Sequence, residues 1–227
     1  LTGDPASASR YIEARLTPLA KENLFNSELT EYADSYDGRN KEPVVLPCKL
    51  PLSLLFGAEG IAVGMSTKIL PHNINEIFDA QIAFLRNKSF KLLPDFYSGG
   101  LLDAREYEDG NGKIQVRAKI DINDDKLLTI SELPFGVTTE SLIQSIQDAV
   151  NKGKLKLSSI DNFTAETVEI ELKASRGMDA EKLLKLLYAF TQCEISISVN
   201  MLLIQNNQPV QLNTSEVLKH NTLRLKD

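Results

Sequence analysis

The most unusual residues of the chain stand at positions 50–73, in the stretch LPLSLLFGAEGIAVGMSTKILPHN. Three glycines alternate there with apolar residues, and glycines let a backbone turn tightly or approach another surface closely. Proteins that bend DNA insert an isoleucine, leucine or phenylalanine between base steps, from a backbone slim enough to enter a groove. Ile61 beside Gly60 fits that role. The alternative is a buried turn in which Ile61 and its apolar neighbours belong to the core.

A second group of residues has the chemistry to contact phosphates. A strand predicted from position 113 places Lys113, Arg117 and Lys119 on one face and aliphatic side chains on the other. Such a basic face is either simply solvated or able to hold the phosphates of a DNA arm. His72 stands just before a predicted helix, where it is interpreted as a structural cap or loop ligand, with a phosphate contact as the alternative.

Composition limits the function classes. The chain has 227 residues, 42% hydrophobic and 25% charged, which is ordinary for a globular protein with a sizeable core. No apolar run approaches the roughly 20 residues of a membrane helix, so we expect a cytoplasmic protein without membrane contact. Cys48 and Cys193 lack neighbouring ligands at metal-binding spacing, which predicts reduced, buried thiols and no metal site. The formal net charge of -6 argues against wrapping nucleic acid unaided.

Hydrophobic periodicity predicts a mixed α/β fold. A helix is expected from Tyr11, restarting at Pro18 behind a Thr17 cap and continuing to about Leu24. A second is expected from Asn73, which forms a capping-box pattern with Glu76. Two more are expected near 141–152 and 179–190. Strands are expected up to Pro47, over 113–132 with a turn at 123–125, and at 167–172, 195–204 and 208–212, with a hairpin turn at 206–207.

Two motifs resemble type IIA DNA topoisomerase A subunits, the family of bacterial gyrase and topoisomerase IV. GDPASASRYIEARL, at positions 3–16, is similar to the active-site segment of that family. EGIAVGMST followed by PHN is similar to the segment that the family uses at its bent DNA. The two motifs follow each other in the family's order and at about the family's spacing. YAFTQCEISISVN is similar to the segment leading out of the tower domain, and its sequence is closer to that of topoisomerase IV than to that of gyrase. Ser35, Leu52 and Phe56 replace asparagines, the last two at positions where gyrases commonly have them.

The resemblance implies roles for individual residues. Tyr11 would be the nucleophile, Arg10 its electrostatic partner and Ile61 the intercalating residue. Without the resemblance, a tyrosine at a helix start is usually a half-buried packing residue with a satisfied hydroxyl.

The implied chemistry of the Arg-Tyr pair is coherent. A phenol with a pKa of about 10 is mostly protonated at neutral pH and needs an activating environment before it attacks phosphorus. A permanently charged guanidinium stabilises both the developing phenolate and the crowded phosphoryl oxygens. A phosphotyrosine ester keeps a reasonable leaving group, so the displaced DNA hydroxyl can reverse the reaction.

The resemblance also implies a domain layout within an α/β (α+β) fold. Residues 1–35 would end a winged-helix domain carrying the tyrosine, and 36–212 would form the tower, including a DNA-bending loop at 57–65. Residues 213–227 would start the helix that leads to a dimer-gate coiled coil. Since the chain begins without methionine and ends in a predicted helix, we expect it to be a fragment of the breakage-reunion region.

The implied function is that of an ATP-dependent type II topoisomerase, chromosome-associated in the cytoplasm. Its partners would be double-stranded DNA, another copy of the A subunit, forming a homodimer, and two B subunits. Mg²⁺ and ATP would be held by the B subunit, and this chain has no G-x-x-x-x-G-K-[ST] phosphate loop. The alternative is a non-catalytic α/β interaction or DNA-binding module, with Tyr11 as a packing residue and Ile61 as core.

Overall fold

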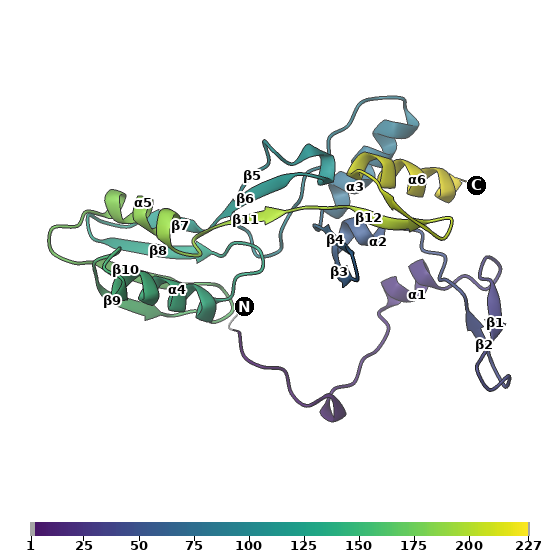
Figure 1. Ribbon diagram of the computed structural model, residues 1–227, viewed down its shortest axis with the longest axis horizontal. Helices are drawn as coiled ribbons and strands as arrows, with labels where there is room; N and C mark the ends of the chain where they lie inside the picture. Colours follow the sequence, from purple (N-terminus) through teal and green to yellow (C-terminus); the bar gives the residue numbers. More distant parts are fainter. Residues whose placement is uncertain (1–2, 227) are drawn as a thin grey trace.

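The computed structural model describes residues 3–226, and these form helices and five small antiparallel sheets (Figure 1). This mixture confirms the predicted α/β (α+β) class. Positions 1–2 and 227, at the outer ends of two of the predicted domain segments, lie outside the described residues.

The largest sheet lies in the C-terminal half of the sequence and is covered by two helices. Its strands are β7 (Lys119–Ile122), β8 (Leu127–Glu132), β9 (Leu157–Asn162) and β10 (Ile170–Ala174), in the order β7-β8-β10-β9. Buried residues alternate with more exposed ones along β8 and β10, so only one face meets the core. Helices α4 (Thr139–Asn151) and α5 (Ala180–Phe190) pack on that face through Leu142, Ile146, Leu183 and Leu187.

A three-stranded sheet continues directly from the first. Strands β5 (Leu101–Asp103), β6 (Lys113–Arg117) and β11 (Glu194–Ser198) pair in the order β11-β6-β5. The buried residue Ala118 joins β6 to β7, and its amide donates to the Cys193 carbonyl at 2.7 Å. A single stretch of chain therefore carries the predicted basic face from one sheet into the next.

Next to the two sheets lies a helical part of the molecule. It is built around a separate apolar core that contains Leu54, Ile77, Met201 and Leu218. It contains α2 (Leu52–Leu55), α3 (Ile74–Leu85) and α6 (Thr214–Lys226), with the hairpin of β12 (Leu202–Gln205) and β13 (Gln208–Gln211). A short turn, η2 (Glu108–Gly110), lies against α6. The hairpin of β3 (Ala58–Ala62) and β4 (Met65–Ile69) projects from this helical part (Figure 1).

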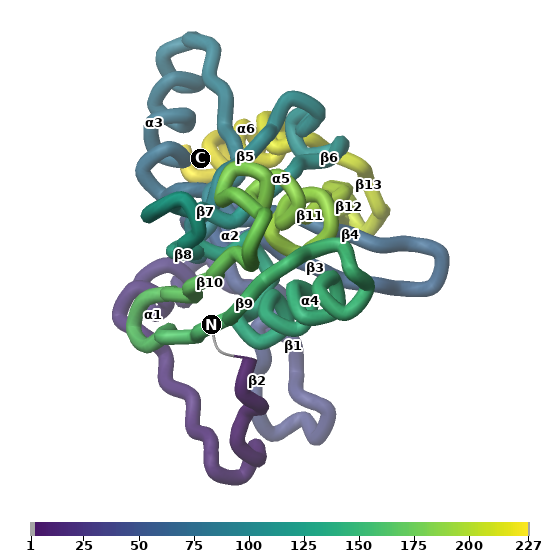
Figure 2. The backbone as a smooth tube through the Cα atoms, turned by 90° about the vertical axis from the view of Figure 1, so that its left-hand side faces the viewer, coloured from purple at the N-terminus to yellow at the C-terminus, as the bar shows by residue number. Residues whose placement is uncertain are grey.

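The N-terminal segment starts beside α4, where Gly3 lies close to Thr138 and Glu140, and then forms an arm that loops away from the two larger sheets (Figures 1 and 2). It contains η1 (Ser9–Tyr11), α1 (Pro18–Leu24) and the paired strands β1 (Tyr32–Asp34) and β2 (Lys41–Pro43). Thr17 caps α1 as predicted, since its hydroxyl accepts from the Ala20 amide at 3.1 Å. The expected helix from Tyr11 is wrong, because η1 lasts three residues and Ile12 is extended. The strand expected up to Pro47 is also displaced, since β2 ends at Pro43.

Other sequence predictions hold with changed boundaries. Asn73 caps α3 as predicted, with its side chain accepting from the Asn75 amide at 2.9 Å. The capping box expected between Asn73 and Glu76 is wrong, because the side chain of Asn73 bonds the amide two residues on and not that of Glu76. The turn at Asn206 and Asn207 is confirmed, and both residues have positive φ. The strand expected over 195–204 is divided, because β11 ends at Ser198 and β12 begins at Leu202. Sequence periodicity does not predict β9, since polar residues interrupt its alternation.

Candidate functional site

Arg10 and Tyr11 lie in η1, on the exposed part of the arm. Tyr11 is 73% exposed, and none of the residues of η1 is buried. The guanidinium carbon of Arg10 lies 4.7 Å from the centre of the Tyr11 ring. A cation in that position is attracted by the ring face and stays close to the phenol. The packing role for Tyr11 is therefore excluded within the described residues, and the phenol and the guanidinium face solvent together.

The arm around this pair carries many apolar side chains that meet no core within residues 3–226. They are Ile12, Leu16, Leu19, Phe25 and Leu29, each at least half exposed. A cluster of exposed large apolar side chains usually marks a surface that another surface covers. The arm has the composition of a segment that packs against further protein or nucleic acid.

Ile61 lies near the tip of the β3–β4 hairpin and is 88% exposed. It stands opposite Ser66 in the strand pairing, one pair away from the tip pair of Ala62 and Met65. Val63, at the turn, is fully exposed as well. Because neither aliphatic side chain belongs to a core, the alternative of a buried turn is wrong. The hairpin presents an isoleucine at the end of a thin two-stranded ribbon, which is the shape required of a wedge.

Gly57, just before the hairpin, and Gly60, within β3, differ in whether the fold itself requires a glycine. Gly57 has a φ of +72°, and a Cβ there would lie 2.6 Å from the Ile69 carbonyl oxygen, so the fold itself requires glycine. At Gly60 the φ is not positive, and a Cβ would meet only the Thr67 methyl group at 3.7 Å. The fold does not require glycine at position 60. A close approach of another molecule beside Ile61 would require it.

His72 is buried, with 3% of its surface exposed, and both ring nitrogens have partners. Nδ1 lies 3.0 Å from the Leu54 carbonyl oxygen, and Nε2 lies 3.1 Å from the Tyr107 hydroxyl. Because a carbonyl only accepts, Nδ1 carries the proton, and Nε2 of the neutral ring accepts from Tyr107. Burial lowers the pKa of His72, which favours this neutral form. The arrangement favours the structural role for His72 over the phosphate contact.

The Tyr107 hydroxyl extends this buried chain of hydrogen bonds to α6. It lies 3.0 Å from Oγ1 of Thr214, the first residue of α6. Burial raises the pKa of Tyr107 to about 12, so the hydroxyl remains a neutral donor. Polar groups therefore connect the loop before α3 with the start of α6 inside the molecule.

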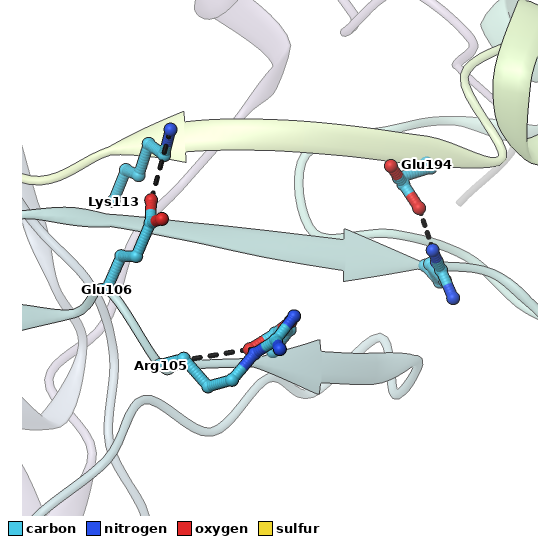
Figure 3. A network of polar contacts seen from close by, with 6 residues as sticks. Arg105, Glu106, Lys113 and Glu194 are labelled. Atoms are coloured by element: carbon cyan, nitrogen blue, oxygen red, sulfur yellow. Dashed lines mark hydrogen bonds and ion pairs between the residues drawn. The ribbon is translucent and has the colours of Figure 1, made fainter.

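The predicted basic residues lie on the solvent side, and each is paired with a carboxylate. Lys113 Nζ lies 3.1 Å from Glu106, and Arg117 donates to Glu194 (Figure 3). Lys119 Nζ lies 3.3 Å from Glu132. The alternation along β6 is confirmed, since Ile114 and Val116 are buried between the exposed cations. All six charged side chains remain partly exposed, so each pair contributes about 0–1 kcal/mol to stability and can exchange partners.

Arg105 is a further cation beside this basic face that sequence reasoning missed. It lines a shallow depression together with Lys113 and Gln115. Its guanidinium makes a bidentate contact with Asp103, with Nε donating to Oδ1 at 3.0 Å and Nη2 to Oδ2 at 2.6 Å. Hydrogen bonds from Arg105 lower the pKa of Asp103, so this carboxylate stays charged. The sequence DAREYED offers no period that would place Arg105 beside the strand.

No group of three or more potential metal ligands occurs among residues 3–226. In the same part of the chain, no helix is both long and apolar enough to span a membrane. The described residues thus offer an exposed phenol beside a guanidinium, an isoleucine at the end of a thin ribbon and a strand face that carries cations.

Comparison with known proteins identifies the family of the chain. The family of the DNA gyrase/topoisomerase IV A subunit matches residues 1–226. The chain is 54% identical over 225 residues to the DNA topoisomerase 4 A subunit of Borreliella burgdorferi, covering 99% of this chain and 36% of that relative. It is 37% identical over 243 residues to the DNA gyrase A subunit of Dehalogenimonas lykanthroporepellens, covering 96% of this chain and 30% of that relative. The chain thus spans about a third of the length of these curated relatives.

Proposed function

The chain belongs to the family of DNA gyrase/topoisomerase IV A subunits, and from this premise we propose that it is the DNA breakage-reunion part of an ATP-dependent type II topoisomerase. The observation that carries the proposal is the exposed Tyr11 with the Arg10 guanidinium 4.7 Å from its ring centre. A nucleophile that attacks a DNA backbone must be accessible, and a cation must accompany it.

The proposed reaction exchanges one phosphodiester for another. The Tyr11 hydroxyl oxygen attacks a backbone phosphorus, and the bond from that phosphorus to the 3′ oxygen breaks. The phenol gives up its proton and the 3′ oxygen takes one up, leaving a 5′-phosphotyrosyl ester and a free 3′ hydroxyl. Arg10 stabilises the developing phenolate and the phosphoryl oxygens. Attack by the 3′ hydroxyl reverses the step without net energy input.

The B subunit completes the proposed assembly. Mg²⁺ stabilises attacking and leaving oxygens when it is bound, and ATP hydrolysis drives passage of a second duplex. Following the family, we assign both cofactors to the B subunit. Two A and two B subunits would act on double-stranded DNA at the chromosome in the cytoplasm, each copy of this chain holding one 5′ phosphate on its Tyr11.

The DNA contacts of this chain divide into two kinds. Ile61, with Gly60 beside it, would enter the minor groove and separate two base pairs, which bends the segment to be cut. Lys113, Arg117 and Lys119 would exchange their carboxylate partners for phosphates of the flanking DNA arm. Release of counterions from the DNA favours this exchange.

The proposed domain layout follows the family. Residues 1–35 would end the winged-helix domain, 36–212 would form the tower with its bending hairpin, and 213–227 would start the helix that leads to the dimer gate. The exposed apolar side chains of the arm support the first assignment, because a winged-helix body would cover them.

Within the family we propose topoisomerase IV rather than gyrase. The support is the 54% identity to the topoisomerase 4 relative, against 37% to the gyrase relative. The test uses the full-length protein with its B subunit, ATP and Mg²⁺, and compares decatenation of linked DNA circles with supercoiling. We expect decatenation without net negative supercoiling. Introduction of negative supercoils would assign the chain to gyrase, and no strand passage in a folded complex would favour a non-catalytic module.

A further inference from the structure

We propose that Asn200 is a positioning residue that fixes the β3–β4 hairpin, and with it Ile61, relative to the sheets. The inference rests on the proposed role of Ile61 as a wedge. Asn200 lies between β11 and β12 and contacts β4 through its backbone and its side chain, and these contacts leave the tip of the hairpin free.

The backbone of Asn200 forms a short antiparallel bridge with Lys68. The Lys68 amide donates to the Asn200 carbonyl at 2.8 Å, and the Asn200 amide donates to the Lys68 carbonyl at 3.1 Å. The Thr67 hydroxyl donates to the same Asn200 carbonyl at 3.2 Å. The outer edge of β4 is therefore paired to a single residue of another part of the chain.

The side chain of Asn200 reaches one residue further along β4. Its Nδ2 donates to the Ser66 carbonyl at 2.7 Å, and its Oδ1 accepts from Gln211 at 3.3 Å. Ser66 is the residue opposite Ile61 in the hairpin pairing. The carboxamide thus holds the backbone of the strand directly across from the proposed wedge.

Asn200 itself is held from both sides. The Val199 amide donates to the Gly112 carbonyl at 2.8 Å, and the Met201 amide donates to Asn111 Oδ1 at 3.1 Å. These contacts tie the neighbours of Asn200 to the loop that precedes β6. Because the hairpin is a two-stranded ribbon that would twist readily alone, its angle depends on such an external bond.

An asparagine suits this position because the site needs a donor and an acceptor at the same time. Aspartate would place a carboxylate against the Ser66 carbonyl and lose the donor, and alanine would lose both. Either change leaves Ile61 and every other residue of the hairpin in place. The expected defect is a misdirected wedge and not a missing one.

The test measures DNA bending in the full-length protein with its B subunit, using a duplex with a fluorescence donor and acceptor at its ends. We expect Asn200→Asp and Asn200→Ala to lose bending to an extent that approaches the loss in Ile61→Ala. Asn207→Asp is the matched control, because it places the same charge on the exposed turn of the β12–β13 hairpin. This control should bend DNA as the wild type does.

A double variant separates positioning from general damage. If Asn200 acts through Ile61, Asn200→Ala adds no further loss of bending when Ile61 is already alanine. Additive losses of bending in the double variant would overturn the inference. It would also be overturned if the single variant Asn200→Ala bent DNA normally while the single variant Ile61→Ala did not. Normal bending by Ile61→Ala itself would refute the proposed wedge, and the role of Asn200 would fall with it.

Discussion

The guanidinium of Arg10 lies over the ring of Tyr11, with 4.7 Å between the guanidinium carbon and the ring centre. The two residues are neighbours in a three-residue 3₁₀ turn whose members are all exposed. The pair therefore depends on local backbone geometry and on no surrounding core among the described residues. This is the arrangement that a reacting phosphate can approach from outside.

Replacing Arg10 by glutamine should slow DNA cleavage more than it weakens DNA binding. The guanidinium is expected to stabilise charge that develops during attack, and loss of one such donor lowers rates by roughly 10²- to 10³-fold. The measurement is single-turnover formation of the covalent adduct, together with DNA affinity. Arg39→Gln, which removes an exposed arginine from the β1–β2 turn, is the control. Equal losses in both variants would show that net charge and not position matters.

The two glycines at positions 57 and 60 should respond oppositely to alanine. Gly57→Ala is expected to destabilise the fold by about 1–3 kcal/mol, because its φ is +72° and the Ile69 carbonyl lies in the way. Gly60→Ala should change the free energy of unfolding by less than about 1 kcal/mol but reduce DNA bending. Thermal unfolding and end-to-end energy transfer measure the two effects. Normal bending by Gly60→Ala would contradict close approach of DNA at that residue.

Neutralising Lys113, Arg117 and Lys119 together should flatten the salt dependence of DNA binding. Each lost phosphate contact reduces the slope of log K against log salt by about 0.9. The measurement is affinity for a duplex with long flanking arms over a range of salt concentrations.

The matched control for this experiment removes Lys152, Lys154 and Lys156, three exposed lysines at the end of α4 and before β9. It changes net charge equally and should leave the slope closer to the wild-type value. An unaltered slope in the variant that lacks Lys113, Arg117 and Lys119 would mean that these cations stay paired with their carboxylates when DNA binds and do not contact phosphates.

The buried His72 should make the fold sensitive to mild acid. Burial lowers its pKa in the folded state, so the unfolded chain binds a proton more readily than the folded chain. Its stabilising contribution is present above an unfolded pKa of about 6.5 and is lost as the pH falls from there through the lower folded pKa.

The free energy of unfolding should therefore fall less between about pH 7.5 and pH 5.5 in His72→Gln than in the wild type. Urea unfolding at the two pH values measures this. His220→Gln, which removes the other histidine of the sequence from an exposed position of α6, is the control. A His72 variant with an unchanged pH dependence would contradict the assignment.

Local sequence signals predict many of the elements. The Thr17 cap, the Asn73 cap and the Asn206–Asn207 turn each satisfy backbone groups within a few residues, so they are readable without tertiary contacts. The alternation of Ile114 and Val116 with basic residues likewise reflects one buried sheet face. The sequence also singles out Ile61, since its flanking glycines have no simple role in a core.

Other features depend on residues distant in sequence. The carboxylates that pair with the basic residues of β6 and β7 come from positions 106, 132 and 194. No sequence pattern within these two strands predicts those ion pairs. The role of Asn200 arises from a bridge to Lys68 across more than a hundred residues. The sequence also predicts a helix from Tyr11, a segment that contains the apolar residues Ile12 and Leu16. In the structure these side chains lack a core to pack against, and the chain from Ile12 to Leu16 forms no helix.

The most direct measurement of the central claim is trapping of the covalent adduct between protein and DNA. The full-length protein, its B subunit, Mg²⁺ and a nicked duplex are combined and denatured, and DNA linked to protein is quantified. Tyr11→Phe removes only the hydroxyl, and Tyr97→Phe is the matched control at another exposed tyrosine. We predict an adduct with the wild type and Tyr97→Phe and none with Tyr11→Phe. An adduct with Tyr11→Phe, or none with a folded, DNA-bound wild type, would contradict the account.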